Sequence, residues 1–96
     1  MIFELDEDGY PTSDTIDNIH QWEGPPGEFF RIICDLFPPY GRFEQRSSDG
    51  VWEVATGGWS GCEEIVEAMM SNIFISYSWM MSKRGGYHEF EDINHI

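Results

Sequence analysis

The chain has 96 residues, with 18 acidic against five basic side chains and a formal net charge of −13. Such a charge repels nucleic acids and anionic membranes, and it favours basic partners. Apolar residues make up 41% of the chain and aromatic residues 16%, which exceeds what a disordered acidic polypeptide carries. We therefore expect a single folded domain over residues 1–96 with its acidic residues at the surface.

Two helices are predicted in the N-terminal part of the chain. Residues 1–11 mix apolar and acidic side chains, which predicts a short strand or an extended arm. Thr12 or Ser13 can cap a helix over about 13–23, where Asp14 in the first turn complements the helix dipole. A dense apolar run then predicts a second, largely buried helix over about 27–37, which ends at the proline pair 38–39.

A hairpin and a third helix follow. The Asp49-Gly50 pair lies between two short strand-like segments at 42–46 and 51–55, which predicts a tight turn. Ser60 and Glu63 have the S-x-x-E spacing of a capping box and predict a helix start there. The helix is expected to end at 71–72.

The last segment predicts a second hairpin. Side chains alternate between two faces over 73–82, which favours a strand, although 73, 76, 77 and 80 also share a helical face. A turn at 83–86 and a return strand at 87–91 follow, and residues 93–96 are expected to be frayed. The predicted fold class is α+β: two helices and then ββαββ, giving a four-stranded antiparallel sheet with helices packed on one face.

Neither the cysteines nor the histidines suggest a metal or cofactor site. Cys34 and Cys62 lie in apolar surroundings and are expected to be reduced core residues. His20, His88 and His95 are scattered, and alternation places His88 on the face opposite its acidic neighbours. No cofactor, metal or catalytic residue is therefore expected. A cytoplasmic location is expected, because neither a signal peptide nor a membrane-spanning stretch is evident.

Two glycine-rich loops are candidate sites. Gly57, Gly58 and Gly61 predict a tight strand-to-helix connection that Ser60 caps, with Trp59 either as a packing plug or as a partner-binding side chain. The second loop carries Arg84 on an exposed turn, where it could bind a partner, simply aid solubility or form an internal salt bridge.

Carboxylates on two predicted helices form the sharpest candidate for a binding surface. Glu63, Glu64 and Glu67 recur at helical spacing as an outward ridge, and Asp14 and Asp17 could form a second. These acids could be an ordinary solvated surface. Alternatively, spaced carboxylates can mimic phosphates and occupy the nucleic-acid-binding groove of another protein, with electrostatic steering of the encounter.

The blocks Thr56-Gly-Gly-Trp-Ser-Gly-Cys-Glu63 and Ser82-Lys-Arg-Gly-Gly-Tyr-His88 resemble two blocks of small uncharacterised bacteriophage and prophage proteins. In that group we expect Asn where Cys62 stands, and His directly after the glycines, where Tyr87 stands here. The resemblance implies a phage-borne origin. Small acidic phage proteins are often inhibitors of host defence, such as anti-CRISPR and anti-restriction proteins.

Three functions follow as hypotheses. The first is a non-enzymatic accessory protein that inhibits a host protein with a basic nucleic-acid-binding surface, without binding nucleic acid or membrane itself. The second is a phage assembly module, possible as a homodimer, with Trp59, Trp79 and Tyr87 forming a protein–protein surface. The third is a small enzyme that uses the 57–61 loop with Arg84 and His88.

Overall fold

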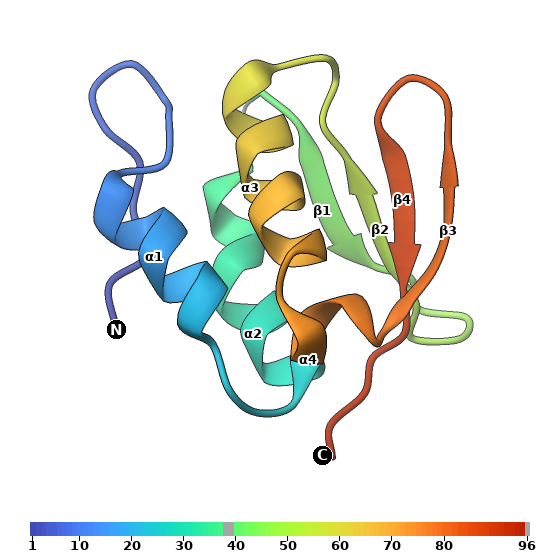
Figure 1. The fold of residues 1–96 in the computed structure, drawn as a ribbon. Helices are drawn as coiled ribbons and strands as arrows, with labels where there is room; N and C mark the ends of the chain where they lie inside the picture. The colour runs from blue at the N-terminus through green and yellow to red at the C-terminus, as the bar shows by residue number, and fades with distance from the viewer. Residues whose placement is uncertain (38–39, 96) are drawn as a thin grey trace.

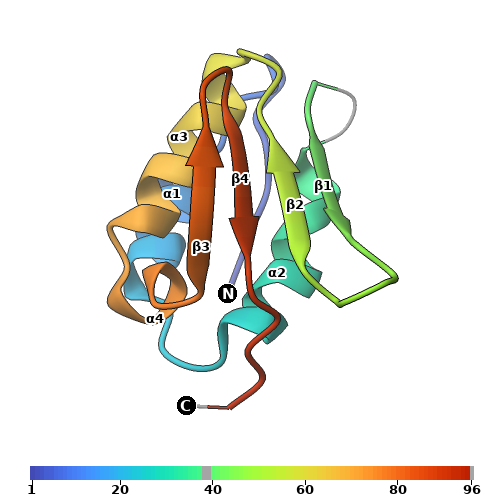
Figure 2. The ribbon, with the colours of Figure 1, turned by 90° about the vertical axis from the view of Figure 1, so that its right-hand side faces the viewer.

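The computed structural model describes residues 1–37 and 40–95. Four strands form one antiparallel sheet in the order β1-β2-β4-β3, and the helices pack on one face of it while the other face is uncovered (Figures 1 and 2). The predicted α+β fold is confirmed. The elements are α1 (Ser13–Gln21), α2 (Pro26–Ile33), the 3-10 helix η1 (Cys34–Leu36), β1 (Arg42–Gln45), β2 (Trp52–Ala55), α3 (Ser60–Met70), α4 (Ile73–Ser76), β3 (Trp79–Lys83) and β4 (Tyr87–Phe90).

An aromatic cluster joins α2 to the sheet. The ring of Phe30 lies 5.3 Å from that of Phe90 on β4 and 5.8 Å from those of Phe43 on β1 and Trp52 on β2. Aromatic pairs at such distances add to the stabilisation that burial already provides. The dense apolar run predicted to form a buried helix therefore makes the centre of the core.

The N-terminal segment packs against α1. Leu5 forms an isolated bridge with Pro11, and the Thr15 hydroxyl both donates to Glu4 O and accepts from Glu4 N. Thr12 caps α1, because its side chain accepts from Thr15 N. The prediction of an arm and of a cap at position 12 or 13 is thus confirmed.

The predicted strand over 73–82 is wrong for its first half. Residues Ile73–Ser76 form the short helix α4, and the strand begins at Trp79. The side chain of Asn72 accepts hydrogen bonds from Phe74 N and Ile75 N, which starts a new helix instead of extending the chain. Only Ile75 of the alternating apolar residues in this stretch is buried.

The C-terminal segment is packed rather than frayed at its start. Gly27 N donates to Ile93 O at 2.7 Å, and Arg31 donates to Asn94 Oδ1 at 3.0 Å. The segment therefore docks on the first turn of α2. The proline pair expected to end the second helix, and the last residue of the predicted frayed end, lie outside the described residues.

The two cysteines differ in their surroundings. Both are free thiols, as predicted, but Cys34 is half-buried and only Cys62 belongs to the buried core. Burial raises the pKa of Cys62 to about 11, with the nearby Glu63 charge acting in the same direction. Among the described residues, no helix combines the length and apolar character needed to cross a bilayer.

Candidate partner-binding surface

Helices α1 and α3 pack side by side and leave an open groove of about 310 Å³ between them. Two of the predicted acidic residues, Glu64 and Glu67, line this groove from α3. His20 and Ile16 line it from α1, one helical turn apart. The groove therefore has two carboxylates on one wall and an imidazole on the other. Ala68 and Ser71 complete the lining.

The three predicted ridge residues are all exposed, but they border two different features. Glu64 and Glu67 face the groove, whereas Glu63 lies close enough to β4 for its charge to act on His88. Burial lowers the pKa of the half-buried His88, and the Glu63 carboxylate opposes that effect. Consecutive helical residues are about 100° apart around the axis, which explains why Glu63 and Glu64 separate.

Asp14 and Asp17 are also exposed, on α1. They are three residues apart and so lie close together on the helix surface. In the described part of the chain, no basic side chain forms an ion pair with either of them or with Glu63, Glu64 or Glu67. The negative charge of α1 and α3 is therefore not neutralised within the molecule.

The ion pairs lie elsewhere, on the sheet and at the C-terminal segment. Arg31 contacts Asp92 at 2.8 Å, Arg46 contacts Asp49 at 2.7 Å, and Arg42 approaches two glutamates at 3.8 Å. Burial alone would raise the pKa of Asp92, but hydrogen bonds from Arg31, Trp52 and Asn94 lower it below the usual value. Arg46 also contacts Glu53 and Glu89 at 3.4 Å. In total, five of the 18 carboxylates form ion pairs with arginine: Glu44, Asp49, Glu53, Glu89 and Asp92.

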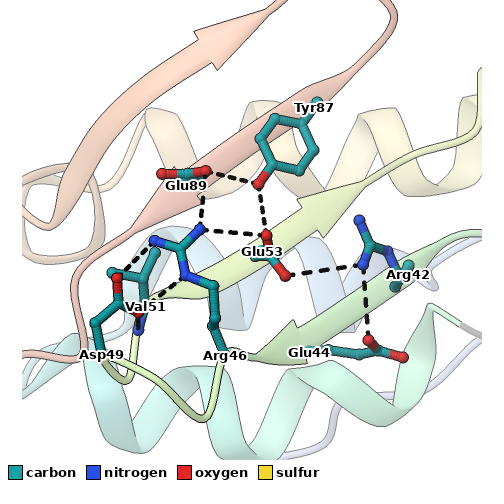
Figure 3. Close-up of polar contacts among 8 residues, drawn as sticks. All are labelled: Arg42, Glu44, Arg46, Asp49, Val51, Glu53, Tyr87 and Glu89. Atoms are coloured by element: carbon teal, nitrogen blue, oxygen red, sulfur yellow. Dashed lines mark hydrogen bonds and ion pairs between the residues drawn. The ribbon is translucent and has the colours of Figure 1, made fainter.

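The uncovered face of the sheet carries a polar network that sequence reasoning missed (Figure 3). One guanidinium nitrogen of Arg46 lies 3.4 Å from both Glu53 and Glu89, and the Tyr87 hydroxyl lies within hydrogen-bond distance of the same two carboxylates. The hydrogen bond to Glu89, burial and the nearby Glu53 raise the pKa of Tyr87. Alternation within each strand gives a signal for these outward positions, but the sequence does not reveal that β2 and β4 are neighbours.

Trp59 is a packing plug. Its ring stacks on Tyr40 at 4.6 Å and lies 5.1 Å from the ring of Tyr10, while its indole nitrogen donates to Gly9 O at 3.3 Å. These contacts hold the N-terminal loop against the start of α3. Of the two predicted roles for Trp59, the structural one is confirmed, and its role in binding a partner stays a prediction.

The predicted capping box at Ser60 is wrong. The N-cap position of α3 is Trp59, which has extended backbone dihedrals and no side-chain cap, so Ser60 is already inside the helix. A capping side chain must precede the first helical residue to reach the free N–H groups. The Ser60 hydroxyl instead shares a hydrogen bond of 2.8 Å with the hydroxyl of Tyr10.

The two glycine-rich loops meet at one end of the sheet. Thr56 N donates to Gly86 O at 3.0 Å, which joins the end of β2 to the start of β4. Gly57 and Gly58 have φ values of 63° and 79°, in the left-handed region that favours glycine. Gly61 is needed for a different reason, because a Cβ there would lie 2.8 Å from Gly9 O and even closer to the Trp59 indole nitrogen.

Arg84 lies exposed in the turn between β3 and β4. The interpretation as an internal salt bridge is wrong, because no carboxylate in the described residues pairs with it. His88, which the enzyme hypothesis invokes, shares a 2.7 Å hydrogen bond through Nδ1 with Ser82 Oγ, and that hydroxyl also accepts from Trp79 Nε1. Among described residues, no cluster of three His, Cys, Asp or Glu side chains could hold a metal ion.

The three aromatic residues predicted to share one surface do not do so. Trp59 belongs to the stack at the N-terminal loop, and Tyr87 lies on the uncovered face of the sheet. Trp79 pairs in register with the buried Phe90 and so lies on the opposite face from Tyr87.

Comparisons with protein-family models, with curated proteins and with solved structures found no match to this chain.

Proposed function

We propose that the protein binds a basic surface of another protein through its α1–α3 face, and that this partner is a nucleic-acid-processing host protein of phage-defence type. The observation that carries the proposal is the segregation of charge. Five exposed carboxylates on two adjacent helices have no ion-pair partner among the described residues: Asp14, Asp17, Glu63, Glu64 and Glu67.

Unpaired carboxylates on a rigid helical scaffold suit recognition of Lys and Arg. A nucleic-acid-binding groove presents such cations at the spacing of a phosphate backbone, and a protein that occupies the groove competes with nucleic acid. Charges of opposite sign also speed the encounter and exclude acidic partners. The two phage-like blocks around the glycine-rich loops support a host defence complex as the class of partner. We do not propose an enzymatic activity.

The test is displacement of nucleic acid from purified effectors. CRISPR effector complexes and restriction enzymes are each loaded with labelled DNA or RNA and titrated with the protein at several salt concentrations. We expect the protein to displace nucleic acid from at least one effector, with an affinity that falls as salt rises, because salt screens exposed charges over about 10 Å at 0.1 M.

A variant of the face and a matched control decide whether α1 and α3 are responsible. The triple variant Glu63→Lys, Glu64→Lys and Glu67→Lys should lose displacement. The control carries the same kind of charge reversal at exposed acids outside α1 and α3, Glu28→Lys, Asp35→Lys and Glu44→Lys, and should retain most of it. Equal displacement by the two triple variants would overturn the proposal for this face.

A further inference from the structure

In contrast to the rest of this acidic chain, one segment is uncharged and exposes large apolar side chains. Residues 68–82 contain no charged side chain, which makes this the longest uncharged stretch of the sequence. It also exposes large apolar residues: Ile73 is 78% exposed, Tyr77 75%, Trp79 44% and Met80 43%. Contiguous exposed apolar residues on an otherwise charged protein indicate an interaction surface.

The same stretch includes a strand edge without charged residues, in which the register shifts between Trp79 and Met81. β3 pairs only with β4 among the described strands, so it is an edge strand with one row of backbone groups outside the sheet (Figure 2). The other edge strand, β1, carries Arg42 and Glu44, whereas β3 has no charge before Lys83. Proteins commonly protect their edges with charges or proline, and an edge without them pairs readily with another strand.

The charges at the two ends of β3 are complementary to each other. Lys83 and Arg84 at one end have no carboxylate partner among the described residues. The other end lies beside Glu91, whose N–H donates to Ser78 O at 2.8 Å. Glu91 is exposed and has no ion-pair partner in the described residues either.

Antiparallel pairing of two β3 strands satisfies both features. A twofold axis near Met81 places Lys83 of one copy opposite Trp79 of the other, and Arg84 opposite Ser78. Arg84 then lies level with Glu91 of the second copy, one strand away, within the reach of long side chains. The symmetry repeats this contact on the other side of the axis.

We propose that two copies of the chain associate through β3, in antiparallel orientation, to form one continuous sheet with Ile73, Tyr77, Trp79 and Met80 at the interface. A second copy is favoured over an unrelated partner because the edge supplies both signs of charge at the required ends. The uncharged stretch also lets two chains of net charge −13 approach where their repulsion is weakest. The proposal does not depend on the function proposed for the α1–α3 face.

Analytical ultracentrifugation over a wide range of protein concentration tests the dimer. The wild-type chain should sediment at twice its mass of 11.2 kDa. Met80→Lys brings two like charges together near the axis and should give a monomer, while Gln45→Lys on the other edge strand should remain dimeric. A wild-type monomer at all concentrations, or a dimer that survives Met80→Lys, would overturn the proposal.

A charge exchange keeps the test decisive if Met80→Lys fails to fold. Arg84→Glu and Glu91→Arg alone should each raise the dissociation constant of the dimer roughly tenfold, because the twofold axis makes each substitution remove two exposed ion pairs. The double variant Arg84→Glu with Glu91→Arg restores both contacts and should return the dimer to near wild-type affinity. Additive weakening in the double variant would overturn the antiparallel arrangement. Nucleic-acid displacement by these variants is measured separately, so that failure of one proposal leaves the other open to its own test.

Discussion

Glu53 and Glu89 lie directly opposite each other on β2 and β4, and the same hydroxyl, that of Tyr87, lies 2.9 Å from one carboxylate and 2.7 Å from the other. Like charges directly opposite on neighbouring strands destabilise a sheet. Arg46 compensates, because its guanidinium contacts both carboxylates and also Asp49 (Figure 3). A single arginine thus joins the first hairpin to the second.

Arg46→Ala should therefore lower the melting temperature more than Arg42→Ala does. Arg42 makes only two long contacts of 3.8 Å, whereas loss of Arg46 leaves Glu53 and Glu89 without their shared cation. Thermal unfolding followed by circular dichroism measures both variants. The difference in melting temperature between wild type and Arg46→Ala should become smaller as the pH falls, because protonated carboxyls no longer repel each other. Equal deficits of the two variants near neutral pH would contradict this role.

The Asp49 carboxylate predicts how stability changes in acid. The hydrogen bond from Arg46 and the N–H of Val51 lower its pKa in the folded state to about 2. A group whose pKa is lowered by folding contributes stability above its ordinary pKa near 4, and this contribution disappears as the pH falls toward 2. Urea unfolding at several pH values in that window should show a smaller loss of stability for Asp49→Asn than for wild type.

Two adjacent glycines in the second turn should respond very differently to alanine. Gly85 and Gly86 both have positive φ, at 90° and 81°, so alanine at either position costs roughly 1–2 kcal/mol of backbone strain. A Cβ at Gly85 meets no atom within 4 Å, but at Gly86 it collides with the Thr56 hydroxyl. Overpacking adds about 1–3 kcal/mol. Chemical denaturation should therefore give a clearly lower free energy of unfolding for Gly86→Ala than for Gly85→Ala. Equal free energies of unfolding would show that the turn at 83–86 does not contact Thr56.

Asn72 is predicted to be one of the most sensitive polar residues. Its buried side-chain amide donates to Ile19 O at 2.8 Å and to Trp22 O at 2.9 Å, while its oxygen caps α4. Asn72→Ala leaves several of these buried groups without partners and should cost about 2–4 kcal/mol of unfolding free energy. The exposed neighbour provides a control, because Ser71→Ala should stay within about 0.5 kcal/mol of wild type. A mild effect of Asn72→Ala would indicate that water replaces the lost bonds.

Much of the fold could be predicted because it depends on local periodicity. The apolar run that predicts a helix over about 27–37 corresponds closely to α2 with η1, and the turn at Asp49-Gly50 to the first hairpin. The predicted apolar face at 29, 32, 33 and 36 is wrong at Ile32, which is 47% exposed, whereas Phe30 is buried. The candidate site was less predictable. Helical spacing predicts that Glu64 and Glu67 face outward, but the groove that they share with His20 requires the packing of α1 on α3.

The errors occurred where a distant residue decided a local structure. Asn72 begins a new helix because the carbonyls at the end of α1 lie within reach of its amide, and no local pattern reveals them. Ser60 lies one position too late to cap α3, and its hydroxyl contacts Tyr10, 50 residues away in the chain. In both cases a local sequence pattern predicted one structure, and a contact with a residue far away in the chain stabilised another.

The fold class and the excess of negative charge can both be predicted from composition and from side-chain spacing along single segments. How that charge is distributed over the surface depends on contacts between distant segments. Folding places Arg31, Arg42 and Arg46 against five carboxylates on the sheet and C-terminal segment, and it leaves α1 and α3 without compensating cations in the described chain. The physical reason is that an ion pair forms between groups brought within about 4 Å, and strand order and helix packing, rather than sequence proximity, set most of those distances.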